Sequence, residues 1–118
     1  MEWGELAALF AGTAEGEGWL ERLRRHWALT REHPEAGRLT AVEDEGEAVR
    51  RHYAESLELV RLAEEAGIPR AGVRSADVGT GGGWPGLAVA CVRPGWEVHL
   101  VEPLGKRAAF LSAAAAEL

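Results

Sequence analysis

The glycine run at residues 79–83 is the feature of this sequence with the clearest chemical meaning. Gly79, Gly81 and Gly83 form a G-x-G-x-G pattern between a predicted strand and a predicted helix. Glycine in such a turn adopts positive φ angles and lets a ligand approach the backbone, because it has no Cβ atom. Backbone N–H groups near the start of a helix add to the binding potential. The pattern predicts a small-molecule site, although a purely structural glycine turn has the same sequence signature.

Two acidic residues stand at the ends of the two predicted strands. Asp77 precedes the glycine run, and Glu102 follows it 25 residues after Asp77, at the end of the next strand. In nucleotide-binding α/β sheets, a carboxylate at the position of Glu102 accepts hydrogen bonds from ribose hydroxyls. The spacing therefore predicts a ligand that contains an adenosine-like ribose.

The glycine pattern disfavours ligands that are held through phosphates. The dinucleotide pattern G-x-G-x-x-G needs glycine at position 84, where Trp84 stands, and no G-K-[S/T] follows. The shorter pattern with Asp77 before it is typical of sites for S-adenosylmethionine (SAM), which carries no phosphate. Asp77 is a candidate partner of the amino group of this cofactor. Trp84 is a candidate for an aromatic contact with the sulfonium, with a packing role as its alternative.

The elements that must position these residues form a βαβ unit followed by one more helix. Strand patterns cover residues 73–78 and 96–101, and helix patterns cover 85–92 and 104–118. Strands joined by a helix pair in parallel, which predicts an α/β fold of the Rossmann-like type.

The N-terminal part is predicted to be a helical lead-in. A helix begins at Gly18, residues 30–37 form a loop around Pro34, and a long helix covers about 44–66 and ends at Gly67. Residues 1–15 are weakly specified and are expected to fray. We therefore predict a helical segment at 1–68 and an incomplete SAM-binding domain at 69–118.

Composition and charge limit the class of protein. Hydrophobic residues make up 47% of the 118 residues, which is enough for one packed domain. The single cysteine, Cys91, excludes an internal disulfide and a multi-thiolate metal site within one chain, and we expect it to be inert core. The net charge of −6 arises in residues 1–66, so any RNA contact would need a local basic patch. No apolar run spans a membrane and no signal peptide is evident, which predicts a cytoplasmic protein.

Three stretches resemble one family. They are similar to motifs of the bacterial small-subunit ribosomal RNA (16S rRNA) guanine-N7 methyltransferases. The first stretch is Asp77-Val-Gly-Thr-Gly-Gly-Gly-Trp-Pro-Gly86, and the second is Arg51-His52-Tyr53-Ala54-Glu55-Ser56-Leu57. The third consists of Arg93-Pro94, Val101-Glu102-Pro103-Leu104-Gly105-Lys106-Arg107 and Phe110-Leu111. This family is also called glucose-inhibited division protein B. Leu39-Thr40 matches part of its N-L-T element. The resemblance covers roughly residues 20–118.

The resemblance implies a class I methyltransferase that uses S-adenosyl-L-methionine and acts on guanine N7 of small-subunit ribosomal RNA. No metal and no catalytic acid or base is expected, because guanine N7 carries a lone pair and no proton. The implied cofactor contacts are Asp77, Gly79, Thr80, Gly81, Gly83, Trp84, Glu102, Pro103 and Leu104. The candidate RNA contacts are Arg51, His52, Lys106 and Arg107, for which a solvent-exposed or packing role is the alternative.

Four positions depart from the family pattern. Arg38 replaces the usual asparagine, Glu55 replaces aspartate, Trp84 replaces phenylalanine or leucine, and Glu102 stands where many members have aspartate. The carboxylate at Glu102 preserves the ribose-binding chemistry. The changes at Arg38 and Glu55 concern the positioning of the substrate.

The number of predicted strands indicates a truncated fold. Class I methyltransferases contain about seven strands, whereas this chain supplies two and stops within a helix. We therefore expect an N-terminal fragment that is inactive alone. Two alternatives remain: another class I methyltransferase, or a non-catalytic half of a Rossmann-like domain that binds a partner through its open sheet edge. A nucleotide oxidoreductase is disfavoured by Trp84.

Overall fold

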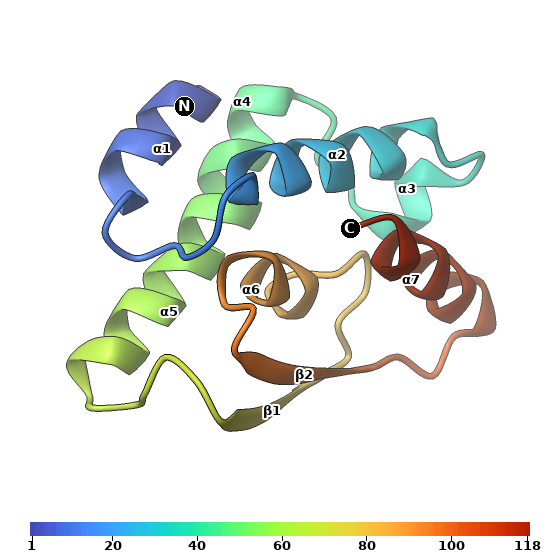
Figure 1. Ribbon diagram of the computed structural model, residues 1–118. Helices are drawn as coiled ribbons and strands as arrows, with labels where there is room; N and C mark the ends of the chain where they lie inside the picture. The colour runs from blue at the N-terminus through green and yellow to red at the C-terminus, as the bar shows by residue number, and fades with distance from the viewer.

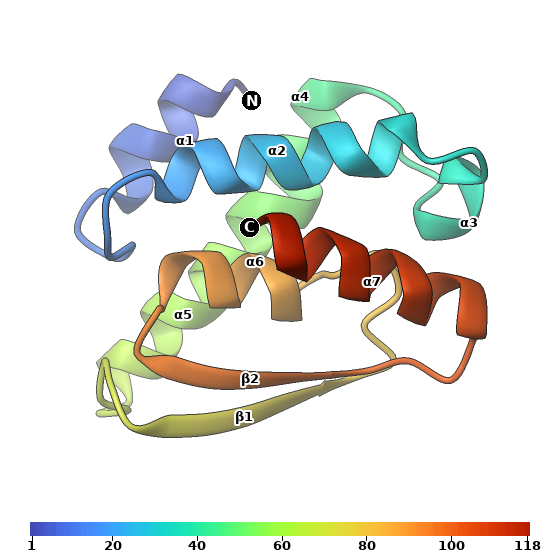
Figure 2. The same cartoon turned by 45° about the vertical axis from the view of Figure 1, so that its right-hand side comes forward.

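The computed structural model describes all of residues 1–118 as an α/β arrangement around a small parallel sheet (Figure 1). In chain order the elements are α1 (Trp3–Phe10), α2 (Trp19–Glu32), α3 (Ala36–Leu39), α4 (Glu45–Ala48), the π-helical η1 (Val49–Ala54), α5 (Glu55–Glu65), β1 (Val73–Val78), α6 (Gly86–Val92), β2 (Trp96–Val101) and α7 (Gly105–Glu117). Figure 2 shows the sheet on one side of the molecule, α6 and α7 next to it, and α1 and α2 beyond them.

The two strands lie parallel, with Val73 opposite Trp96 and Val78 opposite Val101. Their bounds are those predicted from the sequence, and the predicted α/β class is confirmed. Exposure alternates along each strand because only one face of the sheet packs against α6. No helix covers the opposite face, where the side chain of Val78 is 78% exposed and that of Val101 is 46% exposed.

Helix α6 joins the sheet to the N-terminal helices through one continuous core. Six of its seven residues are buried, because the sequence GLAVACV is apolar on every side. The main core cluster combines α6 residues such as Ala88 and Val92 with Leu23 of α2 and Leu57 of α5. A smaller cluster lies under α7 and contains Leu39, Leu87, Phe110, Leu111 and Ala114. The main core contains residues from both sides of position 68. The division of the chain into segments 1–68 and 69–118 stays a prediction.

The expectation that residues 1–15 fray is wrong for residues 3–10, which form α1. Trp3, Leu6 and Phe10 are at helical spacing and are buried in the main core. The indole N–H of Trp3 also donates to Glu45 at 3.2 Å. These tertiary contacts stabilise a helix that is too short to be stable alone.

The predicted loop at residues 30–37 is shorter in the structure. Helix α2 continues to Glu32, and α3 begins at Ala36. The backbone of His33 is extended, with ψ of 134°, because the following Pro34 disfavours the helical region. Pro34 therefore sets the end of α2 at Glu32, three residues later than the predicted loop implied.

The predicted helix at 44–66 is present as α4, η1 and α5 in direct succession. A side-chain oxygen of Asp44 accepts from the amide of Glu47 at 2.8 Å and caps the start. Gly67 ends the helix with φ of 89°, as predicted. The π-helical segment η1 was not predicted, and it carries two residues whose rings pack against Trp84, directly after the glycine run: His52 and Tyr53.

Candidate functional site

The turn between β1 and α6 has the backbone geometry that its glycines predict. Gly79, Gly81 and Gly83 have φ angles of 76°, 59° and 114°. Only glycine adopts these angles without strain. An ideal Cβ on Gly79 or Gly81 would meet no atom within 4 Å, so the backbone there faces open space. These two residues therefore leave room for a ligand against the main chain.

The two strand-end acids bind the backbone of this turn and of the segments that follow the strands. Asp77 Oδ2 accepts from the amide of Gly86 at 2.9 Å, at the start of α6. Glu102 Oε1 accepts from the amide of Gly81 at 2.9 Å, and its Oε2 accepts from Leu104 at 3.2 Å. The structure thus brings both acids to the carboxyl edge of the sheet, on either side of the glycine run.

Most amides of the turn already donate within the chain. Gly79 and Thr80 donate to the carbonyl of Val101, Gly81 donates to Glu102, and Gly83 donates to Thr80. A loop that cradles phosphates needs these N–H groups free. The hydroxyl of Thr80, in contrast, is buried at 2% exposure without a hydrogen-bond partner. The site therefore offers carboxylate and hydroxyl groups rather than free amides.

Sequence reasoning missed a buried histidine that holds the turn from the N-terminal side. His26 of α2 is fully buried, with Nε2 at 2.7 Å from the carbonyl oxygen of Gly82 and Nδ1 at 3.0 Å from the hydroxyl of Tyr53. Burial lowers the pKa of His26 to about 4, so the ring is neutral at pH 7. The carbonyl only accepts, and therefore Nε2 donates to Gly82 and Nδ1 accepts from Tyr53.

This arrangement leaves no room for a side chain at Gly83. A Cβ there would lie 2.9 Å from Leu87 Cβ and 3.0 Å from His26 Nε2. The only sequence signal for His26 is its position next to Trp27, three residues after Leu23 on the apolar face of α2. Burial also raises the pKa of Tyr53 well above its usual value, so its hydroxyl stays a donor.

Trp84 and His52 lie against each other beside the turn. Their rings stack with centroids 4.0 Å apart and an interplanar angle of 14°. The Trp84 ring also lies 4.9 Å from that of His26, so it is in contact with both histidines. Nε2 of His52 is 2.8 Å from the hydroxyl of Thr40, and burial, followed by the charge of Arg51, lowers the pKa of His52. The predicted ligand contacts of Trp84 and His52 stay predictions.

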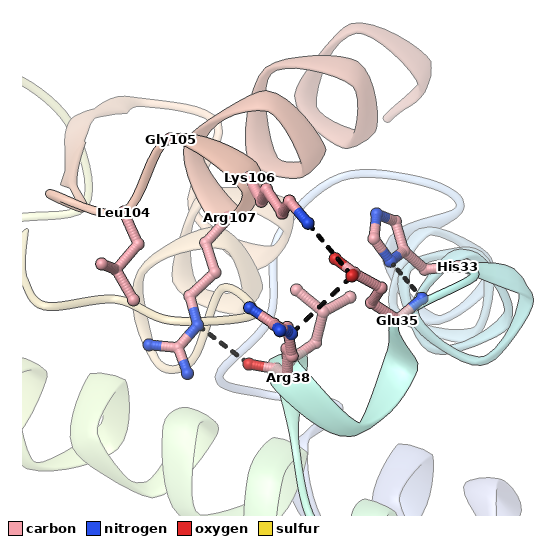
Figure 3. A pocket seen from close by; sticks show the side chains of 8 residues that line it. His33, Glu35, Arg38, Leu104, Gly105, Lys106 and Arg107 are labelled. Carbon is pink, nitrogen blue, oxygen red and sulfur yellow. Dashed lines mark hydrogen bonds and ion pairs between the residues drawn. The ribbon is translucent and has the colours of Figure 1, made fainter.

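The four candidate RNA contacts lie in two places. Arg51 and His52 are on η1, where Arg51 pairs with Glu47 at 2.7 Å. Lys106 and Arg107 are in the first turn of α7, directly after the exposed Pro103 and Leu104. A cavity with a volume of about 270 Å³ lies beside this turn. Figure 3 shows the basic side chains around it.

Other predicted features have simpler surroundings. Cys91 is buried in α6, as expected, and burial raises the pKa of its thiol to about 11. No group of three or more His, Cys, Asp or Glu side chains is arranged to hold a metal ion. None of the helices is both long and apolar enough to cross a membrane.

Comparison with known proteins identifies sequences that are similar to this one. The sequence model of the family described as rRNA small subunit methyltransferase G (GidB) matches residues 20–118. The relatives found include proteins named "Ribosomal RNA small subunit methyltransferase G" from three bacteria. The one from Sorangium cellulosum (strain So ce56) is 48% identical over 80 residues, which cover 68% of this chain and 32% of the relative.

Two further relatives with the same name cover more of the chain. The protein from Bradyrhizobium sp. (strain BTAi1 / ATCC BAA-1182) is 41% identical over 108 residues, covering 89% of this chain and 46% of the relative. The protein from Bordetella avium (strain 197N) is 33% identical over 117 residues, covering 97% of this chain and 51% of the relative. The chain thus spans between a third and a half of the length of these relatives.

Proposed function

The chain belongs to the rRNA small subunit methyltransferase G (GidB) family, and on that premise we propose that it supplies the cofactor site of an enzyme that methylates N7 of a guanine in small-subunit ribosomal RNA. The proposed methyl donor is S-adenosyl-L-methionine. Such a substrate places the enzyme in the cytoplasm. The chain covers only part of its relatives, so we assign to it the cofactor site and part of the RNA surface and expect no activity from it alone.

The main support for the proposal is the hydrogen bonding of the glycine turn and the space in front of its backbone. Its amides at 79, 80, 81 and 83 are already bound within the chain, which disfavours a ligand held by phosphates. Open space faces Gly79 and Gly81, and carboxylates stand on both sides. This combination fits a cofactor with a ribose, an amino group and no phosphate.

The residues present fit that cofactor at three points. Glu102 at the end of β2 is placed to accept hydrogen bonds from ribose hydroxyls. Asp77 uses one carboxylate oxygen for Gly86, which leaves the other for an amino group. The unpartnered hydroxyl of Thr80 gains a partner when a polar ligand enters. Pro103 and Leu104 directly follow Glu102, and we assign them contacts with the ribose side of the cofactor.

The proposed reaction requires the protein to position the reacting groups and does not require it to transfer a proton. When bound, the cofactor supplies a methyl group to an attacking lone pair. The N7 atom of guanine carries a lone pair and no proton, so no general base is needed. The chain must hold the reacting groups together and exclude water, and this alignment lowers the barrier by several kcal/mol. The rigid turn, fixed by Asp77, Glu102 and His26, suits that task.

Calorimetric titration tests the proposal. The chain by itself and the protein encoded by its complete reading frame are each titrated with S-adenosyl-L-methionine and with NADH. We expect the complete protein to bind the first ligand and not the second. Glu102→Gln should weaken binding about tenfold, because hydrogen bonds to a charged acceptor are lost. Glu97→Gln is the matched control, since Glu97 lies on the same strand but pairs with Arg74 on the uncovered face at 2.8 Å.

Two results would contradict the proposal. One is NADH binding in place of S-adenosyl-L-methionine. The other is a complete protein that binds neither ligand and self-associates through its open sheet edge, which would favour the alternative of a non-catalytic half of a Rossmann-like domain. If the cofactor binds, methylation of small-subunit ribosomal RNA is the next measurement, with the modified base identified by mass spectrometry.

A further inference from the structure

The cavity beside α7 is lined by residues from two distant parts of the chain. α3 and the residues before it form one wall, and the first turn of α7 forms the other (Figure 3). Its charged side chains are three cations and one acid. The lining residues are His33, Glu35, Arg38, Leu39, Leu104, Gly105, Lys106 and Arg107.

Arg107 is fixed in place and still has free donors. Its Nε donates to the backbone carbonyl of Arg38 at 2.8 Å, across 69 residues of sequence. The side chain forms no ion pair, and its two terminal nitrogens donate to no atom of the chain. An anchored guanidinium with two free terminal NH2 groups is the donor arrangement that binds phosphate in a bidentate manner.

The first turn of α7 adds backbone N–H donors at the positive end of the helix dipole. The helix has 13 residues, no side chain caps its first turn, and no acid lies in that turn. The amides of residues 105–107 therefore have no acceptor within the helix and stand at its positive end. They are next to Lys106 and Arg107, so side-chain and backbone donors converge on the cavity.

Glu35 holds the other two cations without neutralising the cavity. One of its oxygens lies 3.1 Å from Lys106 Nζ and 3.7 Å from Arg38 Nε. The hydrogen bond from Lys106 lowers the pKa of Glu35, so this acid stays ionised at neutral pH. One acid among three cations leaves an excess of positive charge in a chain whose net charge is −6. A carboxylate ligand would balance only part of this excess.

We propose that this cavity binds a phosphate group, either one of an RNA backbone or one of a free nucleotide. Arg107 supplies the bidentate contact, the first turn of α7 supplies amide donors, and Lys106 and Arg38 supply charge. The choice of RNA as the source rests on the proposed function. Binding of phosphate itself does not depend on that function.

Titration of the chain with inorganic phosphate, followed by amide NMR, tests the site directly. We expect saturable shifts at the amides of residues 105–107. Arg107→Gln should weaken the apparent affinity about tenfold, because a charge-assisted contact is lost. Arg24→Gln is the control, since Arg24 is an arginine on α2 outside the cavity. Equal affinities for both variants, or shifts spread over all basic residues, would overturn the proposal.

A second arm identifies the source of the phosphate. A single-stranded RNA and a nucleoside monophosphate are titrated separately at several salt concentrations. If the site takes an RNA phosphate, Arg107→Gln should reduce the slope of log K against log salt by about 0.7, the value for one lost contact on a single strand. An unchanged slope with weakened nucleotide binding assigns the site to a free nucleotide. Failure of methylation alone would refute the proposed function and leave this site intact.

Discussion

Replacement of His26 by phenylalanine should reveal how strongly the buried histidine supports the glycine turn. His26 is fully buried and makes hydrogen bonds of 2.7 Å to Gly82 and 3.0 Å to Tyr53. In His26→Phe, a buried carbonyl and a buried hydroxyl lose their partners, and each costs about 1–3 kcal/mol. We therefore expect the free energy of unfolding at pH 7 to fall by about 2–6 kcal/mol. Tyr53→Phe removes only one bond and should cost about 1 kcal/mol.

The pH dependence separates this mechanism from simple loss of packing. The pKa of His26 is about 4 in the folded chain, whereas the ordinary histidine pKa of 6.5 applies in the unfolded chain, so the unfolded chain binds more protons between these pH values. Wild-type stability from this residue is complete above pH 6.5 and is lost as the pH falls to 4. The loss is about 3 kcal/mol. The variant lacks this contribution, so the difference between the two proteins should shrink by that amount.

Urea denaturation followed by tryptophan fluorescence at pH 7, 5.5 and 4 measures the effect. Comparison of wild type with His26→Phe cancels the titration of the carboxylates, which both proteins share. A difference in free energy that stays constant across this range would show that His26 is not held neutral by burial. A loss below 1 kcal/mol at pH 7 would show that its two hydrogen bonds do not stabilise the turn.

Three more substitutions or probes test other parts of the structure. Gly83→Ala should cost more than about 1 kcal/mol in urea denaturation, because φ is 114° and the new Cβ would lie 2.9 Å from a leucine. Glu64→Gln should lower the free energy of unfolding, because it removes the 3.0 Å partner of Arg93, which is only 1% exposed and then keeps only Glu15 at 3.7 Å; Glu65→Gln, in an exposed pair with Arg61, should lower it less. The thiol of Cys91, with its pKa raised to about 11, should resist a thiol reagent at pH 8 until urea unfolds the chain, and rapid labelling of the folded chain would contradict its burial.

The sequence by itself determined the βαβ unit and the position of its glycine turn. The two strands have the predicted bounds, because their apolar residues and flanking glycines report local backbone preferences. The positive φ angles at Gly79, Gly81 and Gly83 follow from residue type. The strand-end placement of Asp77 and Glu102 follows from the parallel topology that the helical connection imposes.

Only the tertiary structure decided which distant residues meet at the glycine turn and at the cavity beside α7. His26 reaches Gly82 across 56 residues, and Arg107 reaches Arg38 across 69 residues. Such pairs depend on how packed helices rotate against one another, which periodicity along one helix does not report. The same reason explains α1, whose short sequence becomes a stable helix only when Trp3, Leu6 and Phe10 enter the shared core. Local patterns thus specify the backbone of the glycine turn, whereas long-range packing specifies the side chains that hold it in place.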